Sequence, residues 1–334
     1  MRKFLLFLVS LLIGIGLFIW VIKFVGWQEI KNAFLVFTGW RGLIIFFLTF
    51  FLALVINWKW KVILKSRGNE VSFFELFRFY LAGFSLTYFF PMIFFGGETF
   101  RAYLLKEKKS LPWSKGMASV VIDRIFDWTT NLIMVFFGTI FFLFKIGLPP
   151  KKLAIIFGGT FLFWLLGISF FYFKVFKRES LARFFLKLFG YQSQNSEPLE
   201  FEKELFNFFQ LKSLSFWKGL SLAFLEEVVN FLRTWILISF LGKNIALLPA
   251  LSIVSFSYLA TMIPIPTSLG THDLIQAFAF SALGFGANFG TAFVLIIRGA
   301  EVILALIGIG ILFRLGVKLF EDSLFKNNPS KYEI

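Results

Sequence analysis

The sequence has no cysteine and only one histidine among its 334 residues. Without cysteine the chain can form no disulfide and no thiolate metal site, and one histidine cannot build a histidine metal centre. We therefore expect no metal and no other cofactor. Charged side chains are also scarce, at 16% of residues, whereas roughly a quarter of the residues in a soluble domain are charged. This composition excludes an ordinary soluble protein.

Long apolar runs take the place of the missing charge, and 58% of the residues are hydrophobic. The runs are about 17–25 residues long, which lets a helix cross roughly 30 Å of hydrocarbon. Their Phe, Leu and Ile residues do not alternate with polar ones, so they favour helices over a membrane β-barrel. The sequence predicts an all-α polytopic membrane protein that forms one membrane domain over residues 1–334.

The net charge of +15 is distributed in a way that indicates a membrane and not a nucleic-acid partner. Lys and Arg residues lie at the ends of the apolar runs, where they set orientation and contact anionic lipid headgroups. Arg2 and Lys3 precede a first run that is too long for a signal peptide. We predict a multi-pass protein of the cell (inner) membrane with both termini cytoplasmic, membrane lipids as partners and no nucleic-acid binding.

Six apolar runs are predicted to cross the membrane completely, and two further regions are interrupted. The six runs cover residues 4–22, 43–58, 117–144, 153–173, 216–241 and 289–313. The first interrupted region begins with run 73–95, and the second joins runs 247–263 and 271–286. The residues that interrupt them are Pro91, Gly96 and Gly97 in the first region and Pro264, Pro266 and Gly270 in the second.

Helices broken at membrane depth are typical of re-entrant hairpins. Basic residues flank the first region on both sides, so we expect it to enter and leave from the cytoplasm. The basic residues before it are Lys59, Lys61, Lys65 and Arg67. The prediction is therefore six transmembrane helices plus two re-entrant hairpins, and eight plain spans are the alternative.

An internal repeat emerges when the chain is shifted against itself by about 173 residues. Asn57 then falls on Asn230, Pro91 on Pro264 and Gly97 on Gly270. With one further residue of shift, Arg124 and Asp127 fall on Arg298 and Glu301. The predicted units are 43–144 and 216–313, in halves divided by a polar linker at 191–212. Their predicted hairpins enter from opposite sides, which is the inverted repeat of alternating-access transporters.

Ionisable residues within apolar runs are the candidate functional residues, because a charge in hydrocarbon costs about 2.5–3.5 kcal/mol on insertion scales. Arginine suits bidentate contact with a phosphate. We expect the arginines to bind a lipid phosphate and the acids to orient them or carry a proton. The arginines are Arg101, Arg124 and Arg298, and the acids are Glu98, Asp127, Glu226, Glu227, Asp273 and Glu301.

Structural roles are open for the same charged residues. Arg124 with Asp127, and Arg298 with Glu301, are spaced to neutralise each other on one helix face. Glu226 and Glu227 can equally bind a cation, relay protons, or pair with Arg233 or Arg298.

At these motifs the chain resembles the flippase-like family that includes the transmembrane region of lysylphosphatidylglycerol synthases. The resemblance rests on an early Pro91 and Gly97-Glu98 followed by Arg101, on Arg124 with Asp127, on the late proline–glycine loop before Asp273, and on Arg298. It covers roughly residues 4–318 and implies lipid translocation between leaflets. It does not imply the synthase or glycosyltransferase activity of longer relatives, whose soluble domains have no counterpart here.

The function expected from the sequence is a lipid flippase or scramblase without enzymatic activity. Its substrate is expected to be an anionic, aminoacylated or polyprenyl-phosphate lipid. The alternatives are an ion or small-molecule secondary transporter, an accessory subunit of a separate lipid-modifying enzyme, and a membrane-embedded transferase, for which the sequence offers no metal or donor motif.

Overall fold

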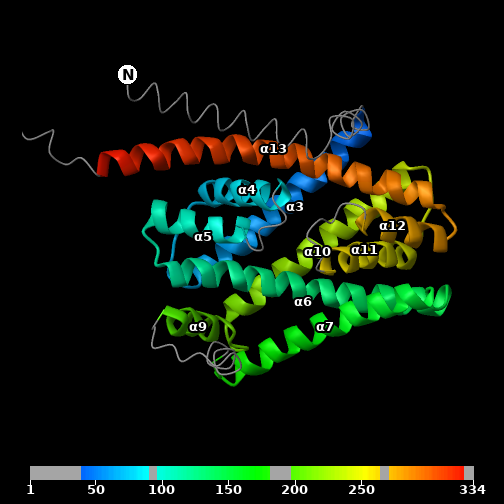
Figure 1. Cartoon of the computed structure of the whole chain (residues 1–334), viewed down its shortest axis with the longest axis horizontal. Coiled ribbons are helices and arrows are strands. Elements are labelled where there is room, and N and C mark those ends of the chain that lie inside the picture. The colour runs from blue at the N-terminus through cyan, green and yellow to red at the C-terminus, as the bar shows by residue number, and fades with distance from the viewer. Residues whose placement is uncertain (1–38, 90–95, 181–196, 264–270, 327–334) are drawn as a thin grey trace, which may run out of the picture.

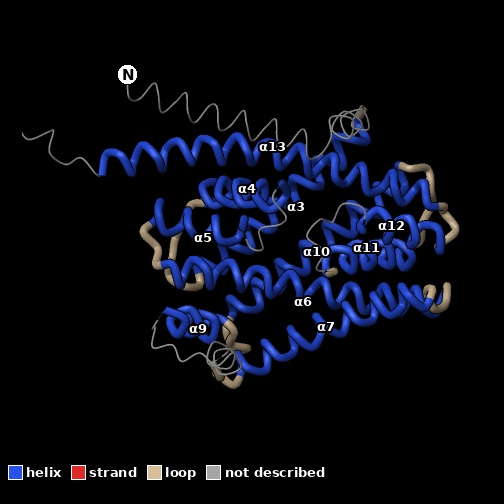
Figure 2. Tube along the Cα trace, viewed as in Figure 1, coloured by secondary structure: helices blue, strands red, loops and turns tan. Residues whose placement is uncertain are grey.

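The fold is all-helical throughout the part of the chain that the computed structural model describes, residues 39–89, 96–180, 197–263 and 271–326 (Figure 2). The predicted first span at 4–22 lies outside those residues. The helices are α3 (Trp40–Lys65), α4 (Phe73–Phe89), α5 (Gly96–Lys109), α6 (Trp113–Lys145), α7 (Lys151–Phe176), α9 (Glu197–Phe208), α10 (Leu214–Phe240), α11 (Leu247–Met262), α12 (Thr271–Ala282) and α13 (Ala287–Lys326).

Four of these helices are long and apolar enough to cross a membrane: α3, α6, α7 and the Ala287–Gly316 part of α13. Each covers a run predicted to be a span. The predicted span 216–241 coincides with α10, whose 27 residues suffice in length but include several charged side chains. These helices are consistent with the predicted polytopic membrane protein.

Helices α4 and α5 form an antiparallel pair in the first interrupted region. Lys109 of α5 reaches Glu75 at the start of α4, with 2.6 Å between Nζ and Oε2. Near the other end Gly97 lies against Gly83, and a Cβ on Gly97 would overlap the Gly83 carbonyl oxygen. Only glycine allows this close approach. The two helices have 17 and 14 residues, so each is shorter than the roughly 30 Å of a bilayer core.

Helices α11 and α12 form the corresponding pair in the second interrupted region. Gln276 of α12 donates from Nε2 to the carbonyl oxygen of Ile253 at 3.1 Å and to Oγ of Ser257 at 2.5 Å. With 16 and 12 residues, these helices are also short for a full crossing. In Figure 1 the α4–α5 pair lies toward one end of the molecule and the α11–α12 pair toward the other.

Helices α3 and α10 run antiparallel along each other through the centre. At one end Arg41 donates from Nη1 to the carbonyl oxygen of Phe240 at 3.2 Å. Further along, Lys59 of α3 meets Glu226 of α10, with 2.8 Å between Nζ and Oε2. The order of these contacts along the two helices establishes their opposite directions.

Each short helix pair also packs against the long helix of the other half. Ser252 and Ser255 of α11 donate to the carbonyl oxygens of Gly138 and Met134 of α6 at 2.8 and 2.6 Å. On the opposite side, α4 packs against α13, where a Cβ on Gly308 would overlap the carbonyl oxygen of Leu81. The two halves are therefore interlocked.

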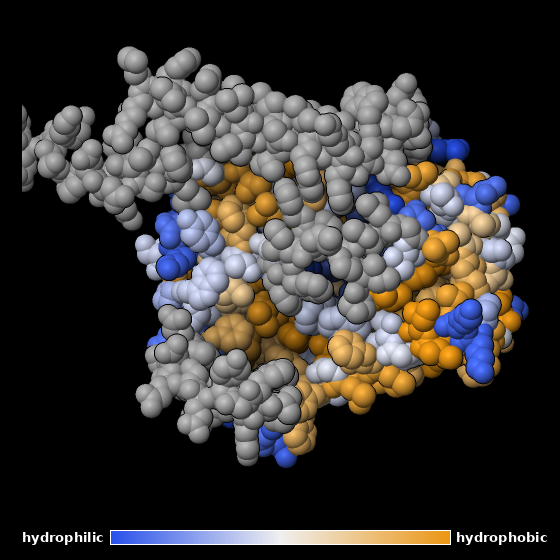
Figure 3. Space-filling model, viewed as in Figure 1, coloured by the Kyte–Doolittle hydropathy of each residue, from blue (hydrophilic) through white to orange (hydrophobic). Residues whose placement is uncertain are grey.

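The outer surface is rich in apolar side chains. Figure 3 shows hydrophobic residues over much of the visible middle of the molecule. Helix α7 is the least buried of the four described candidate spans and exposes large side chains such as Ile155, Phe163 and Leu166. Large exposed apolar side chains are expected where lipid surrounds the protein.

The predicted polar linker 191–212 contains a helix that the sequence analysis did not anticipate. Helix α9 occupies Glu197–Phe208, and its Leu205 and Phe208 are buried in the core. Phe208 contacts Phe126 of α6 edge-on. The apolar residues of this segment are spaced for one face of a helix, and that face packs against the membrane helices.

Candidate functional site

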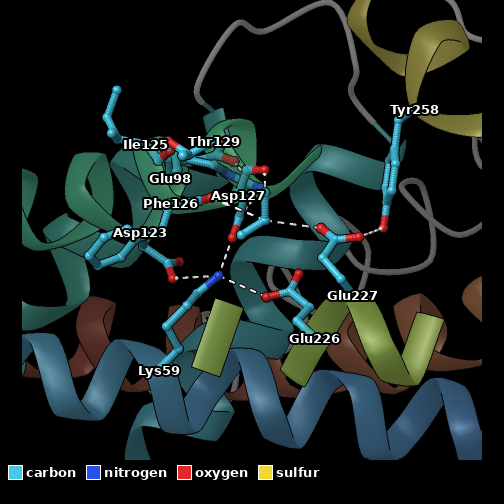
Figure 4. Close-up of polar contacts among 12 residues, drawn as sticks. Lys59, Glu98, Asp123, Ile125, Phe126, Asp127, Thr129, Glu226, Glu227 and Tyr258 are labelled. Atoms are coloured by element: carbon cyan, nitrogen blue, oxygen red, sulfur yellow. Dashed lines mark hydrogen bonds and ion pairs between the residues drawn. The ribbon is translucent and has the colours of Figure 1, made fainter. Parts of the chain in front are cut away.

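A buried lysine lies at the centre of the charged residues in the interior. Lys59 of α3 is fully buried, and its ammonium group lies among three carboxylates, as Figure 4 shows. Nζ is 3.3 Å from Oδ1 of Asp123 and 2.8 Å from Oε2 of Glu226, and it also binds Asp127. A buried charge is costly unless it is paired in this way.

The placement of Lys59 corrects the sequence analysis, which counted it among the basic residues at the cytoplasmic flank. Its partners are set by two helices: Asp123 and Asp127 are four residues apart on one face of α6, and Glu226 comes from α10. A signal was present in the sequence, because the acids inside the apolar runs outnumber the arginines there. That excess required another buried cation.

Arg124 and Arg298, which the predicted repeat aligns, make similar ion pairs. Arg124 of α6 binds Glu98 in the first turn of α5 and also Asp127, at 3.3 Å. Arg298 of α13 binds Asp273 in the first turn of α12, at 3.0 Å. Acids are favoured at such helix N-termini. In each half, one ion pair thus joins the start of the second short helix to the following long helix.

The contacts also give the partners of Glu301, Glu226 and Glu227, which the sequence left open. Glu301 lies 3.7 Å from Arg233 of α10, whereas Arg298 takes Asp273. Glu226 binds Lys59. Glu227 accepts hydrogen bonds from the hydroxyls of Tyr258, at 2.5 Å, and Thr130, at 3.0 Å.

Arg101 of α5 is held by an acid and an aromatic ring. Its Nη2 donates to Oδ2 of Asp123 at 3.0 Å, and its guanidinium carbon lies 4.0 Å from the centre of the Trp60 ring. Stacking on tryptophan is a favourable cation–π arrangement. Arg101 is therefore fixed over α3.

A cavity of about 260 Å³ lies between the two halves beside this network. Its charged lining consists of Arg101, Arg124, Asp127, Glu226, Arg233 and Glu301. The remaining lining is mainly apolar and includes Leu52, Ile56, Phe84 and Leu304. The cavity therefore offers fixed charges of both signs to a ligand inside an otherwise apolar protein.

The predicted site residues are distributed unevenly around this cavity. Arg101, Arg124, Asp127, Glu226 and Glu301 line it, whereas Arg298 does not. Arg233, another ionisable residue within a predicted span, also lines it. Gly96 and Gly97 begin α5. Pro91, Pro264, Pro266 and Gly270 lie outside the described residues.

Among the residues placed by the structure, no group of three or more histidine, aspartate and glutamate side chains is arranged to hold a metal ion. The ammonium group of Lys59 is the cation that Asp123, Asp127 and Glu226 share.

Comparison with known proteins gives a family and one curated relative. The family described as the lysylphosphatidylglycerol synthase TM region matches residues 7–308. A UPF0104 membrane protein from Methanocaldococcus jannaschii is 23% identical over 269 residues, which cover 78% of this chain and 80% of that protein. No solved structure matches the chain.

Proposed function

The chain belongs to the lysylphosphatidylglycerol synthase transmembrane-region family, and from this premise we propose that it moves a lipid between the leaflets of a membrane. The proposed substrate is an anionic, aminoacylated or polyprenyl-phosphate lipid. The proposed activity is transport without an enzymatic step. A separate lipid-modifying enzyme is a possible partner under this proposal.

The charged cavity is the observation that carries the proposal. Charged side chains buried in a membrane protein are expensive, and they mark substrate pathways. Here six charged side chains line one cavity at the contact between the two halves, and three of them, Arg101, Asp127 and Arg233, are buried. At about 260 Å³ the cavity is smaller than the roughly 300–1,000 Å³ of a pocket for a drug-sized ligand. It therefore suits a lipid headgroup whose acyl chains remain outside among the apolar helices.

The proposed mechanism uses two units related by an inverted repeat. A shift of about 173 residues carries α3, α4, α5 and α6 onto α10, α11, α12 and α13. The shifted starts and ends agree within a few residues, except that α13 continues further than α6. The same relation carries the contact of Gly116 with Ala102 onto that of Gly290 with Gln276. Because the equivalent helices α3 and α10 are antiparallel, units related in this way would face opposite sides of the membrane.

Each unit would supply one gate. The Arg124–Glu98 pair fastens the tip of α5 to α6, and the Arg298–Asp273 pair fastens the tip of α12 to α13. In the proposed cycle a lipid phosphate draws Arg124 or Arg298 away from its acid, which loosens that short helix pair. The two pairs open in turn, so the headgroup reaches the cavity from one side and leaves to the other.

The proposed orientation follows the positive-inside rule. Arg67 after α3 is ion-paired with Glu204 of α9, so these segments lie at one end of the molecule. The last turn of α5, with Lys106, Lys108 and Lys109, lies near the start of α4, because Lys109 pairs with Glu75. We assign this end to the cytoplasm. The α4–α5 pair would then enter from the cytoplasm and the α11–α12 pair from outside.

A translocation assay in vesicles tests the proposal. The purified protein is reconstituted, and the exchange of fluorescent phosphatidylglycerol between leaflets is followed by dithionite quenching of the outer leaflet. Parallel samples use its lysyl ester and a fluorescent polyprenyl phosphate. Movement of one of these lipids above the rate in protein-free vesicles is expected. Movement of none of them contradicts the proposed function.

A further inference from the structure

The three arginines that line the cavity differ in how far their charge is compensated. Arg124 binds two carboxylates, Glu98 and Asp127. Arg101 shares the carboxylate of Asp123 with Lys59. Arg233 is different because neutral side chains hold it in place.

Two neutral acceptors and one long ion pair hold the guanidinium group of Arg233. Nη1 donates to Oγ1 of Thr49 at 3.2 Å, and Nη2 donates to Oδ1 of Asn230 at 2.8 Å. Its carboxylate neighbour, Glu301, is 3.7 Å from Nη1, which is too long for a hydrogen bond. An incoming anion therefore competes with this long ion pair and not with a hydrogen-bonded carboxylate.

Arg233 and Arg101 each also have a buried donor without a partner. The Nε–H group of either arginine has no hydrogen-bond acceptor within the described ranges. Their side chains are only 8% and 3% exposed. A buried donor left without an acceptor costs free energy, and both residues line the same cavity. Both side chains line one cavity, and each keeps one donor that its present partners leave unsatisfied.

We infer that Arg233 and Arg101 together bind the phosphate group of the ligand, with Arg233 as the principal contact. A guanidinium group matches phosphate oxygens with two parallel N–H donors, which an ammonium group cannot do. Glu301 is then the group that the phosphate displaces from Arg233. This phosphate site rests on the proposed function in one respect, that the phosphate belongs to a lipid.

The repeat explains why this phosphate site is single and asymmetric. Arg233 of α10 stands 173 residues after Trp60 of α3, and Trp60 is the ring on which Arg101 stacks. The second half therefore delivers a guanidinium group directly from its first helix. The first half uses the equivalent position to support an arginine from α5.

Binding to the purified full chain in detergent tests this inference. Calorimetric titration with short-chain phosphatidylglycerol is compared with titration by the matching diacylglycerol, which has no phosphate. Arg233→Gln is expected to weaken binding of the phospholipid by at least about tenfold, the loss of one charged hydrogen bond. Arg233→Lys should give an intermediate loss, since it keeps the charge but not the fork. Arg78→Gln, a change at an exposed arginine of α4, should change nothing.

Glu301→Gln provides a variant with the opposite expected sign, and it decides the question if Arg233→Gln does not fold. Removing the competing carboxylate should tighten phospholipid binding, whereas a merely structural role for the pair predicts no gain. Equal affinity of wild type and Arg233→Gln, or weaker binding by Glu301→Gln, overturns the inference.

Inorganic phosphate as a third ligand distinguishes the source of the phosphate. We expect it to compete weakly with the phospholipid in wild type and not in Arg233→Gln. If inorganic phosphate binds as tightly as the phospholipid, the phosphate site is correct but its ligand is not a lipid. Because no step of this titration requires translocation, a negative vesicle assay and a negative binding result remain separate outcomes.

Discussion

Lys59 and Glu226 form an ion pair of 2.8 Å across the contact between α3 and α10, deep inside an apolar protein. The pair joins two helices that the proposed repeat relates to each other. Asp127, which also binds Lys59, continues the network to Arg124 and so to the tip of α5. One lysine therefore connects both halves and one proposed gate.

Replacing Lys59 by Met should destabilise the protein strongly. The change leaves Asp123, Asp127 and Glu226 without their shared cation, and breaking a buried ion pair costs about 3–5 kcal/mol. Thermal unfolding of the purified protein measures the effect. Lys65→Met is the matched control, because Lys65 is on the same helix with a side chain that is 69% exposed. Adding Glu226→Gln to Lys59→Met should recover part of the loss, and full additivity of the two changes would contradict the pairing.

Removing either gate arginine should stop lipid movement and leave the protein in the membrane. Arg124→Ala and Arg298→Ala each delete the guanidinium group that alternates between an acid and a phosphate. The vesicle assay measures translocation, and membrane fractionation measures insertion. A translocation rate equal to that of wild type in either variant would contradict the proposed gate mechanism.

Gly97→Val should disrupt the α4–α5 pair. A side chain there meets the backbone of Gly83 and the hydroxyl of Thr87, and overpacking of this kind typically costs about 1–3 kcal/mol. Gly158→Val on α7 is the control, because no atom lies within 4 Å of a Cβ at that position. Gly270→Val, at the second interruption, is expected to impair translocation too. Thermal unfolding and the vesicle assay measure stability and activity. If Gly97→Val is as stable and active as Gly158→Val, the close contact between α4 and α5 is contradicted.

Two glycines of α13 offer a closer comparison, on the contact between the halves. Gly308 faces the backbone of Leu81 on α4, whereas Gly310 faces open space. Gly308→Val should therefore lower the unfolding temperature and Gly310→Val should leave it nearly unchanged, since both changes have the same effect on helix propensity. Gly138→Val on α6, which meets Leu251 and Ser255 of α11, should resemble Gly308→Val. Similar unfolding temperatures for all three variants would argue against the interlocked packing.

The helices could be predicted from sequence because lipid imposes a simple rule on their composition. The runs 117–144 and 153–173 are recovered almost residue by residue as α6 and α7. Helix α9 was missed because its face is short, and only burial against α6 reveals its role.

Several charged residues that line the cavity could be singled out from the sequence, but their pairings could not, and their role in function stays a prediction. Arg124, Asp127 and Glu226 do gather at one cavity, because ionisable groups in lipid must face the interior. The depth of Lys59 and the role of Arg233 depend on how α3 and α10 pack together. A single sequence contains no direct signal for that packing.

Single-cysteine labelling from the two sides of the membrane tests the central claim, two inverted units around one cavity. The sequence contains no cysteine of its own, so cysteines placed at Lys65, Lys108, Lys243 and Asn288 can be labelled without background. The account predicts that positions 65 and 108 react only from the cytoplasm and that 243 and 288 react only from outside. A split of either pair across the membrane would show that one short helix pair spans it, and would contradict the inverted arrangement.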